Sequence, residues 1–273
     1  MATQQMGSSS LRPFGGAGEL LSAHLANGSF EPHFHEAFSL GIIRAGACSF
    51  TCAGRPMLAR AGDIVVMHPY EVHTGSAVDG CLDYQMLYID AKTLAAWLRD
   101  FSGVPRFASA VLRDGPLFTK LEQKLSVPIP SGHSAEVGDA FRRLAERHAT
   151  GVTSFAPSWT DWPTFLESRR LLRTASRPCV QELARLGGYE RTYFSRTFRR
   201  KVGLAPVAFA RLERARAAKG LIAQGMSLSQ ASVEAGFADQ AHMSRVFRAI
   251  YGVTPGQYAA DHCSRSGGGW AAD

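Results

Sequence analysis

The sequence lacks the features that mark an exported or membrane-spanning protein. No apolar run approaches the roughly 18–20 residues that a membrane helix needs. The first residues, MATQQMGSSSLRPFGG, contain no apolar signal core. The five cysteines are scattered, without CxxC pairs or a disulfide-like framework. We therefore expect a cytoplasmic protein with reduced thiols and no membrane contact.

Charged residues are also few, at 19% of the 273 residues, while hydrophobic residues make up 45%. This composition excludes a disordered chain, and the length is enough for two domains with separate cores. The charge is uneven. Residues 163–273 carry 17 Lys and Arg against 8 Asp and Glu, a net of +9, whereas residues 1–162 carry 13 against 15, a net of −2. The C-terminal part is therefore expected to bind a polyanion, the alternative being a solvated basic face.

Residues 236–258, GFADQAHMSRVFRAIYGVTPGQY, predict an amphipathic helix with defined ends. Asp239 is placed to cap its start and Gly252 to end it. Apolar residues recur at i, i+3, i+4, i+7 and i+8, which predicts one buried face. The members of this face are Met243, Val246, Phe247, Ile250 and Tyr251.

A second copy of this pattern lies upstream, in residues 183–206, LARLGGYERTYFSRTFRRKVGLAP. Gly188 lies 48 residues before Gly236, and Ser195 lies 49 before Ser244, so the second turn has one extra residue. Each copy reads as a short helix, a Gly-aromatic turn and a longer helix, which is helix-turn-helix geometry. The Ala- and Arg-rich segment between the copies is expected to form a long helix.

The outward residues of both longer helices suit double-stranded DNA. A helix fits the major groove, where Arg binds guanine and Gln binds adenine through paired hydrogen bonds. Arg199 and Arg200, at the end of the first longer helix, suit phosphates. These motifs resemble the DNA-binding domain of AraC/XylS transcription regulators over about residues 164–261. The resemblance places further base-facing residues at Arg191, Thr192, Ser195 and Arg196, and at Gln240, Ala241, Ser244 and Arg245.

Two positions depart from the family pattern. Glu190 replaces the usual small capping residue before the first longer helix, although a carboxylate suits a helix N-terminus. Ser232 replaces the usual Ala at a helix–helix contact, which is expected to loosen the second copy slightly.

The remaining chain predicts an α+β protein of two domains. Residues 30–90 read as a small antiparallel, cupin-like β-barrel with a hairpin near Ala53-Gly54, and they resemble the effector domain of the same family. The rest is divided as follows: a loosely ordered arm at 1–29, a helical dimerisation region at 91–150, a linker at 151–163, the all-α double helix-turn-helix domain at 164–262, and a flexible tail at 263–273. The helices at 91–150 have narrow apolar stripes, which fit either a cap on the barrel or a dimer seam.

The predicted barrel contains a partial metal-ligand pattern. His33 and His35 share a strand face, and His68 and His73 follow downstream. The carboxylate that completes a cupin site is missing, because Glu36 points the other way on a strand. We therefore expect no metal and no cofactor, and assign these histidines to an effector pocket or to the core. The resemblance implies an effector contacted by His33, His35, Arg44, His73, Tyr84 and Met86. An inward Arg44 needs an anion, from the protein or from the effector.

The sequence thus predicts a regulator, not an enzyme, that binds operator DNA under control of a small molecule. By resemblance, we expect an activator that contacts RNA polymerase and acts as a homodimer. Two alternatives stay open: a metal-dependent cupin enzyme fused to a DNA-binding module, and a regulator without a small-molecule effector.

Overall fold

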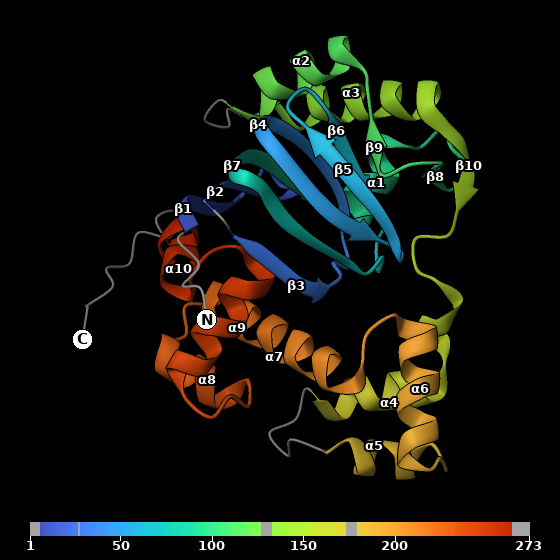
Figure 1. Cartoon of the computed structure of the whole chain (residues 1–273), viewed down its shortest axis with the longest axis vertical. Coiled ribbons are helices and arrows are strands. Elements are labelled where there is room, and N and C mark those ends of the chain that lie inside the picture. The colour runs from blue at the N-terminus through green and yellow to red at the C-terminus, as the bar shows by residue number, and fades with distance from the viewer. Residues whose placement is uncertain (1–5, 27, 127–132, 173–178, 264–273) are drawn as a thin grey trace. The chain divides into compact units, whose positions relative to one another are not determined.

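The computed structural model describes residues 6–26, 28–126, 133–172 and 179–263 (Figure 1). The chain forms two compact units, and the boundary between Pro157 and Ser158 falls in the range predicted as a linker. The first unit combines strands with helices, and every regular element described from Ser158 onward is helical. The predicted α+β fold with two domains is confirmed. No helix in the described ranges is long and apolar enough to span a membrane.

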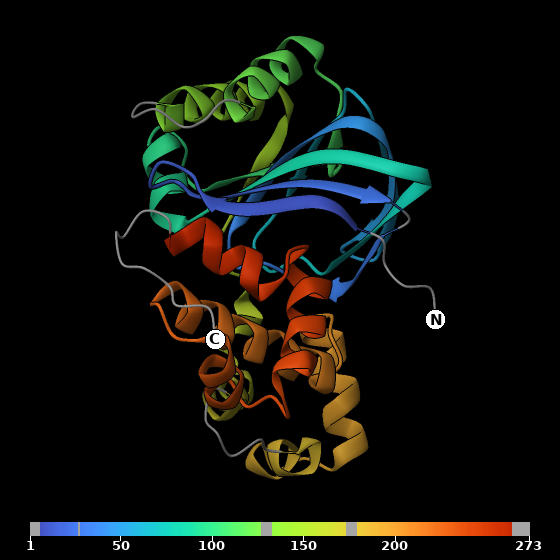
Figure 2. The same cartoon turned by 90° about the vertical axis from the view of Figure 1, so that its left-hand side faces the viewer.

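The first unit is built on a curved, eight-stranded sheet (Figure 2). The strands lie in the order β1-β2-β7-β4-β6-β9, with β3 also paired to β7 and β5 to β4. Their bounds are β1 (Met6–Pro13), β2 (Gly18–Ala26), β3 (Ser29–His33), β4 (Phe38–Cys52), β5 (Arg55–Arg60), β6 (Ile64–Met67), β7 (His73–Ile89) and β9 (Val111–Leu112). The predicted hairpin joins β4 to β5, where Cys52 pairs with Arg55 and Ala53 and Gly54 both have positive φ.

The predicted arm at 1–29 is wrong for its described part, because residues 6–13 and 18–26 are strands of the sheet. β2 pairs with β7 along its whole length, from Gly18 opposite Ile89 to Ala26 opposite Cys81. Leu21, Ala23 and Leu25 are buried at alternating positions on one face of β2, and Leu20 is buried on the other face. The Gly- and Ser-rich composition of the preceding residues hid this short alternation.

Both faces of the central strands are covered. Side chains alternate along a strand, so Phe38, Leu40 and Ile42 of β4 enter a core shared with the helices. Ser39 and Ile43 of the same strand line a cavity on the opposite face. In β7, Leu87 and Ile89 join the core, while Tyr84, Met86 and Tyr88 line the cavity.

Three helices pack on the core face: α1 (Ala91–Trp97), α2 (Gly115–Leu125) and α3 (His133–His148). The stripe of α2 is Leu117, Leu121 and Leu125, and all three are buried in the same core as the sheet. The stripe of α3, which includes Phe141, is buried there too. These stripes therefore cap the sheet, and they are not open to a second copy. Residues 91–150 are also not wholly helical, because β8 (Val104–Phe107) pairs with β10 (Ala149–Thr153).

The second unit begins with a 3₁₀ turn, η1 (Ser158–Asp161), and α4 (Pro163–Leu172). Two short–long helix pairs follow, α5 (Val180–Leu186) with α6 (Arg191–Val202) and α8 (Leu228–Glu234) with α9 (Gln240–Tyr251). The predicted long helix between the pairs is α7 (Pro206–Ala223), and α10 (Pro255–Cys263) ends the fold. Beyond Cys263, the predicted tail lies outside the described residues.

The two copies have the same local determinants. Glu190 and Asp239 cap α6 and α9 by accepting hydrogen bonds from backbone N–H groups of the first turn. Backbone donors to Glu190 also lower the pKa of its carboxyl. The prediction that Glu190 suits this helix start is therefore correct. Gly203 and Gly252 end the helices in the left-handed conformation, with φ of 81° and 73°.

Candidate functional site

The predicted DNA-reading residues lie on the outer sides of α6 and α9. Most are exposed: Arg191, Thr192, Arg196, Arg199 and Arg200 on α6, and Gln240, Ala241 and Arg245 on α9. The opposite sides are buried, through Phe194 and Phe198 in the first copy and Met243 and Phe247 in the second. Each helix thus separates a packing face from a polar face that is open to a ligand.

Ser195 and Ser244 occupy equivalent, half-buried places on this polar face. The Ser195 hydroxyl donates to the Arg191 carbonyl at 2.9 Å, and the Ser244 hydroxyl donates to the Gln240 carbonyl at 2.8 Å. Each hydroxyl proton is therefore committed to the helix, while its oxygen keeps lone pairs. In these rotamers both serines present hydrogen-bond acceptors, which suit the amino groups of cytosine or adenine.

The first copy carries more basic and aromatic surface than the second. Lys201 follows Arg199 and Arg200, and its ammonium lies 5.4 Å from the centre of the Trp162 ring. Tyr193, in the first turn of α6, is 50% exposed and packs on Tyr189. Our sequence reasoning missed Tyr193, because the equivalent residue is His242 and the repeat gave no matching aromatic.

A buried ion cluster links α4 to α7 in the second unit. The Glu213 carboxylate of α7 has no exposed side-chain surface, and it pairs with Arg169 of α4 at 3.3 Å and with Arg216 at 2.6 Å. A charge buried at this depth is stable only with such partners. Sequence reasoning missed this cluster too. The sequence feature that could have revealed the cluster is the carboxylate of Glu213, which follows Leu212 among the buried positions of α7.

The first unit contains a cavity of about 60 Å³ on the face of the sheet opposite the helices. Four of the predicted effector residues line it: His33, His73, Tyr84 and Met86. The remaining wall is mostly apolar, with Phe30, Ile43, Phe50 and Val65 among its members. A volume of this size admits a few water-sized groups.

Arg44 does not line this cavity, so its prediction as a pocket residue is wrong. Ile43 faces the cavity, and Arg44, the next residue, turns to the other side of β4. Its guanidinium lies 3.8 Å from Asp83 and 3.7 Å from Glu122, and its side chain is 38% exposed. The anion that Arg44 requires thus comes from the protein.

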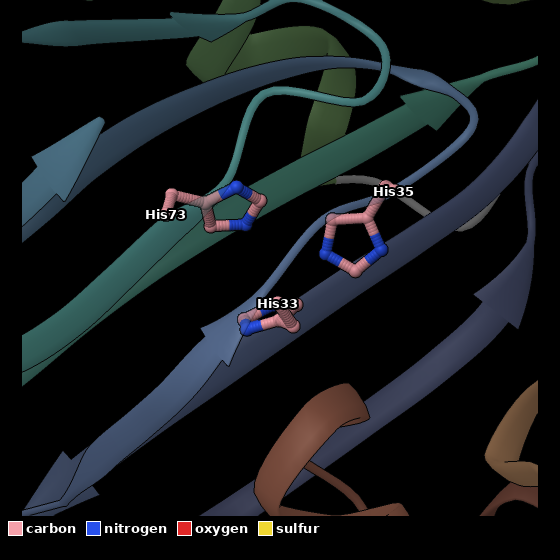
Figure 3. A group of neighbouring side chains, drawn as sticks. All are labelled: His33, His35 and His73. Carbon is pink, nitrogen blue, oxygen red and sulfur yellow. The ribbon is translucent and has the colours of Figure 1, made fainter. Parts of the chain in front are cut away.

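His33, His35 and His73 converge at the edge of the cavity (Figure 3). His33 ends β3, His73 begins β7 and His35 lies in the loop after β3. The ring centroids are 4.4–5.2 Å apart, and one nitrogen from each ring lies within 4.8 Å of the others. No carboxylate joins this cluster among the residues that the structure describes.

Two of these rings have a fixed orientation. Nδ1 of His33 donates to the Glu31 carbonyl at 2.6 Å, and Nδ1 of His73 donates to the Glu71 carbonyl at 2.8 Å. Their Nε2 atoms are therefore left with the lone pair when the rings are neutral. Burial lowers the pKa of His73. The Glu71 carbonyl and carboxylate raise it, but the effect of burial is larger. This ring is neutral at physiological pH.

Burial keeps the neighbouring groups uncharged as well. It raises the pKa of both Tyr84 and Tyr88 and raises the pKa of the Cys48 thiol to about 11. His68 does not belong to the cluster. It comes directly after β6 and lies on the core side of the sheet, where its ring centroid is 5.3 Å from that of Phe38. The cavity wall is therefore mostly apolar, and its polar features include the imidazole of His73, the phenols of Tyr84 and Tyr88 and the thiol of Cys48.

The fold and these two sites define a DNA-binding regulator with a ligand-binding domain. Family models agree: an "AraC-like ligand binding domain" matches residues 15–144, and a "Helix-turn-helix domain" matches residues 183–261. The chain belongs to the AraC/XylS family of transcriptional regulators.

Similar proteins include the uncharacterized HTH-type transcriptional regulator YbfI of Bacillus subtilis, 26% identical over 223 residues that cover 78% of this chain and 81% of YbfI. An HTH-type regulator of Haemophilus influenzae is 31% identical over 80 residues, which cover 29% of this chain and 27% of that protein.

Among solved structures, apo ToxT K231A from Vibrio cholerae has a TM-score of 0.58 at 14% identity, covering 89% of this chain and 97% of its own. ToxT with a bound unsaturated fatty acid has a TM-score of 0.56 at 12% identity, covering 97% and 99%. At these identities the similarity concerns the fold.

Proposed function

We propose that the protein activates transcription by placing α6 and α9 in two adjacent major grooves of operator DNA. The repeated helix-turn-helix carries this proposal, because it presents two polar faces with equivalent serines and arginines. Arg196 and Arg245 suit guanine, and Gln240 suits adenine. Arg199 and Arg200 suit the phosphates beside the first groove.

The cavity of the first unit is the proposed effector site. Its mostly apolar wall suits a small molecule with an apolar body and one polar group, which meets His33, His35 or His73 while Tyr84 and Met86 contact the body. The matched ligand-binding family supports this assignment, as does the fatty acid in the similarly folded ToxT. Because the cavity is only about 60 Å³ and is partly open to solvent, a larger effector would extend out of its open side.

We also propose that the protein acts in the cytoplasm as a homodimer that contacts RNA polymerase. The net charge of +7 and the absence of a spanning helix among the described residues are compatible with this setting. Since the apolar stripes of α2 and α3 are buried within one chain, a dimer has to use other surfaces.

Selection of genomic fragments by the full-length protein tests the proposed function. We expect enrichment of one sequence with two elements about 10 base pairs apart, the spacing of successive major grooves on one face. The neighbouring genes would then indicate the chemistry of the effector. Recovery of fragments without any shared sequence would contradict the proposal.

The histidine cluster favours a second candidate, a metal-dependent cupin enzyme fused to a DNA-binding module. The missing carboxylate and the regulators among the relatives count against it. Turnover of a substrate by the metal-loaded protein would support the enzyme.

The third possibility, a regulator without a small-molecule effector, is tested by filling the cavity with Gly75→Leu. If the wild type shows full effector-dependent control of a promoter and this variant loses that control, a regulator without a small-molecule effector is excluded.

A further inference from the structure

The histidine cluster has the features of a metal site, although the sequence predicts none. Three imidazoles, from β3, the loop that follows it and β7, lie close together, with one nitrogen of each within 4.8 Å of the others (Figure 3). Burial is high, since His33 and His73 are 3% and 7% exposed. Imidazole is a common ligand for Zn²⁺, Cu²⁺, Fe²⁺ and Ni²⁺, and three histidines hold the metal in several catalytic zinc sites.

The hydrogen bonds of the cluster favour coordination through Nε2. In metal sites the second nitrogen of a ligating histidine usually donates to a carbonyl or carboxylate, which fixes the tautomer and the ring orientation. His33 and His73 both do so, through carbonyls two residues earlier, Glu31 and Glu71. Rings held in this orientation direct Nε2, the nitrogen away from the carbonyl, toward a coordinating role.

The distances allow a bound ion after small side-chain rotations. Zn–N bonds of about 2.0–2.1 Å place tetrahedral ligand nitrogens about 3.3 Å apart. One nitrogen of each ring, Nδ1 or Nε2, lies within 4.8 Å of the others, so these three nitrogens have to approach by about 1.5 Å at most. Rotations about the side-chain bonds of His35, which is half-buried in a loop, supply part of this movement.

We propose that His33, His35 and His73 bind one divalent transition-metal ion, and that its remaining coordination position faces the effector cavity. His33 and His73 line that cavity, so a ligand inside it reaches the ion directly. Three neutral imidazoles leave the charge of the ion uncompensated in an apolar pocket, which favours an anionic donor as the fourth ligand. This inference rests on the proposed effector site, and it implies that the polar group of the effector is a small anion such as a carboxylate.

Cobalt binding to the intact, full-length protein tests the site. The protein is stripped with a chelator and titrated with Co²⁺, whose visible absorption reports a site of low coordination number. We expect one Co²⁺ per chain in the wild type and at least tenfold weaker binding in His33→Gln and His73→Gln. His24→Gln, on β2 of the same sheet and outside the cluster, is the matched control and should bind as the wild type does.

The proposal is overturned if the wild type gives no cobalt spectrum, or if both cluster variants keep it. Circular dichroism checks the folding of each variant. X-ray absorption of the Zn²⁺-loaded wild type gives a reading that needs no variant: three imidazole ligands are expected, and fewer than three would contradict the site.

Azide, a small anion, probes the open position. A change in the cobalt spectrum on addition of azide is expected, and an unchanged spectrum would contradict an anion-binding position at the ion. Binding of the same preparations to the selected DNA fragments separates the two proposals. Failure of metal binding with DNA binding intact rejects the metal site only, whereas a wild type that selects no sequence rejects the proposed function.

Discussion

Glu213 is a buried charge whose loss we expect to destabilise the second unit. Glu213→Gln removes the negative charge that Arg169 and Arg216 share. Removing one partner of a buried ion pair leaves the other charge uncompensated, so we expect a loss of about 3 kcal/mol in the free energy of unfolding. Urea unfolding of the full-length protein measures this loss.

Glu167→Gln is the matched control, because Glu167 pairs with Arg170 on the exposed side of α4. An exposed pair in water contributes little, so its removal should leave the unfolding midpoint unchanged. Equal unfolding curves for Glu213→Gln and the wild type would contradict the importance of the buried cluster.

At the residue scale, the sequence predicted the pocket in part. Tyr84 and Met86 alternate along a strand with polar and apolar neighbours, and both line the cavity as expected. Arg44 was misplaced because Ile42 and Ile43 are both buried, one in each face of the sheet. When both faces are covered, hydrophobic alternation no longer shows which side a residue takes.

At the scale of elements, the turns between paired helices depend on glycine. Gly188 and Gly236 hold equivalent places in the two copies, with φ of 69° and 77°. Space around Gly188 is open, so Gly188→Ala adds no clash and exposes only the cost of the left-handed backbone. We expect the variant to lose about 1–2 kcal/mol of stability in thermal or urea unfolding.

The same substitution in a helix gives the control. Gly220 lies in α7 with open space around it and without a positive φ. Gly220→Ala should therefore stabilise the second unit by about 0.5 kcal/mol, because alanine favours the helix. If both variants shift the midpoint in the same direction, the account of the Gly188 turn is wrong.

Asp114 joins the start of α2 to the end of α3. Its carboxylate accepts hydrogen bonds from the Leu117 N–H at 3.2 Å and from His148 Nε2 at 2.9 Å, and it pairs with Arg147 at 3.1 Å. Burial opposes its ionisation, but these partners outweigh burial and lower the pKa of Asp114. Ionised Asp114 therefore stabilises the fold.

We expect Asp114→Asn to cost about 2 kcal/mol at neutral pH, the typical contribution of hydrogen bonds to a charged group. Because the folded pKa is depressed, the contribution is complete above the unfolded pKa of about 3.9 and is lost as pH falls through the folded value. Urea unfolding from pH 7 to about pH 3 should show the gap between variant and wild type narrowing only in acid. A gap independent of pH would contradict the role of the charge.

Helices and strands differed in how well the sequence predicted them. The α5–α6 and α8–α9 pairs have strong periods, capping residues and a repeat, and all four helices match the expectation. The strands β1 and β2 were missed. β1 pairs with β2, and β2 pairs with β7 across 55 to 71 positions, from Ala26 opposite Cys81 to Gly18 opposite Ile89. Such long-range pairing leaves little trace in the local sequence.

At the scale of the whole molecule, the second unit presents the proposed DNA-reading helices and the first unit holds the proposed effector cavity. The basic residues concentrate in the second unit, and the cavity belongs entirely to the first. The helix-turn-helix repeat made DNA binding by the second unit predictable from the sequence. The histidine cluster was only partly predictable, since His33, His35 and His73 were all candidates but the exclusion of His68 depends on which side of β6 it takes.

The most direct test is a footprint of the full-length protein on its selected operator, compared with those of Arg196→Ala and Arg245→Ala. We expect two protected major-groove segments about 10 base pairs apart on one face of the DNA. Each substitution should lose the contact in one segment only and weaken specific binding by about 1–3 kcal/mol. A single protected segment, or wild-type footprints and affinity in both variants, would contradict the claim that α6 and α9 read the DNA together.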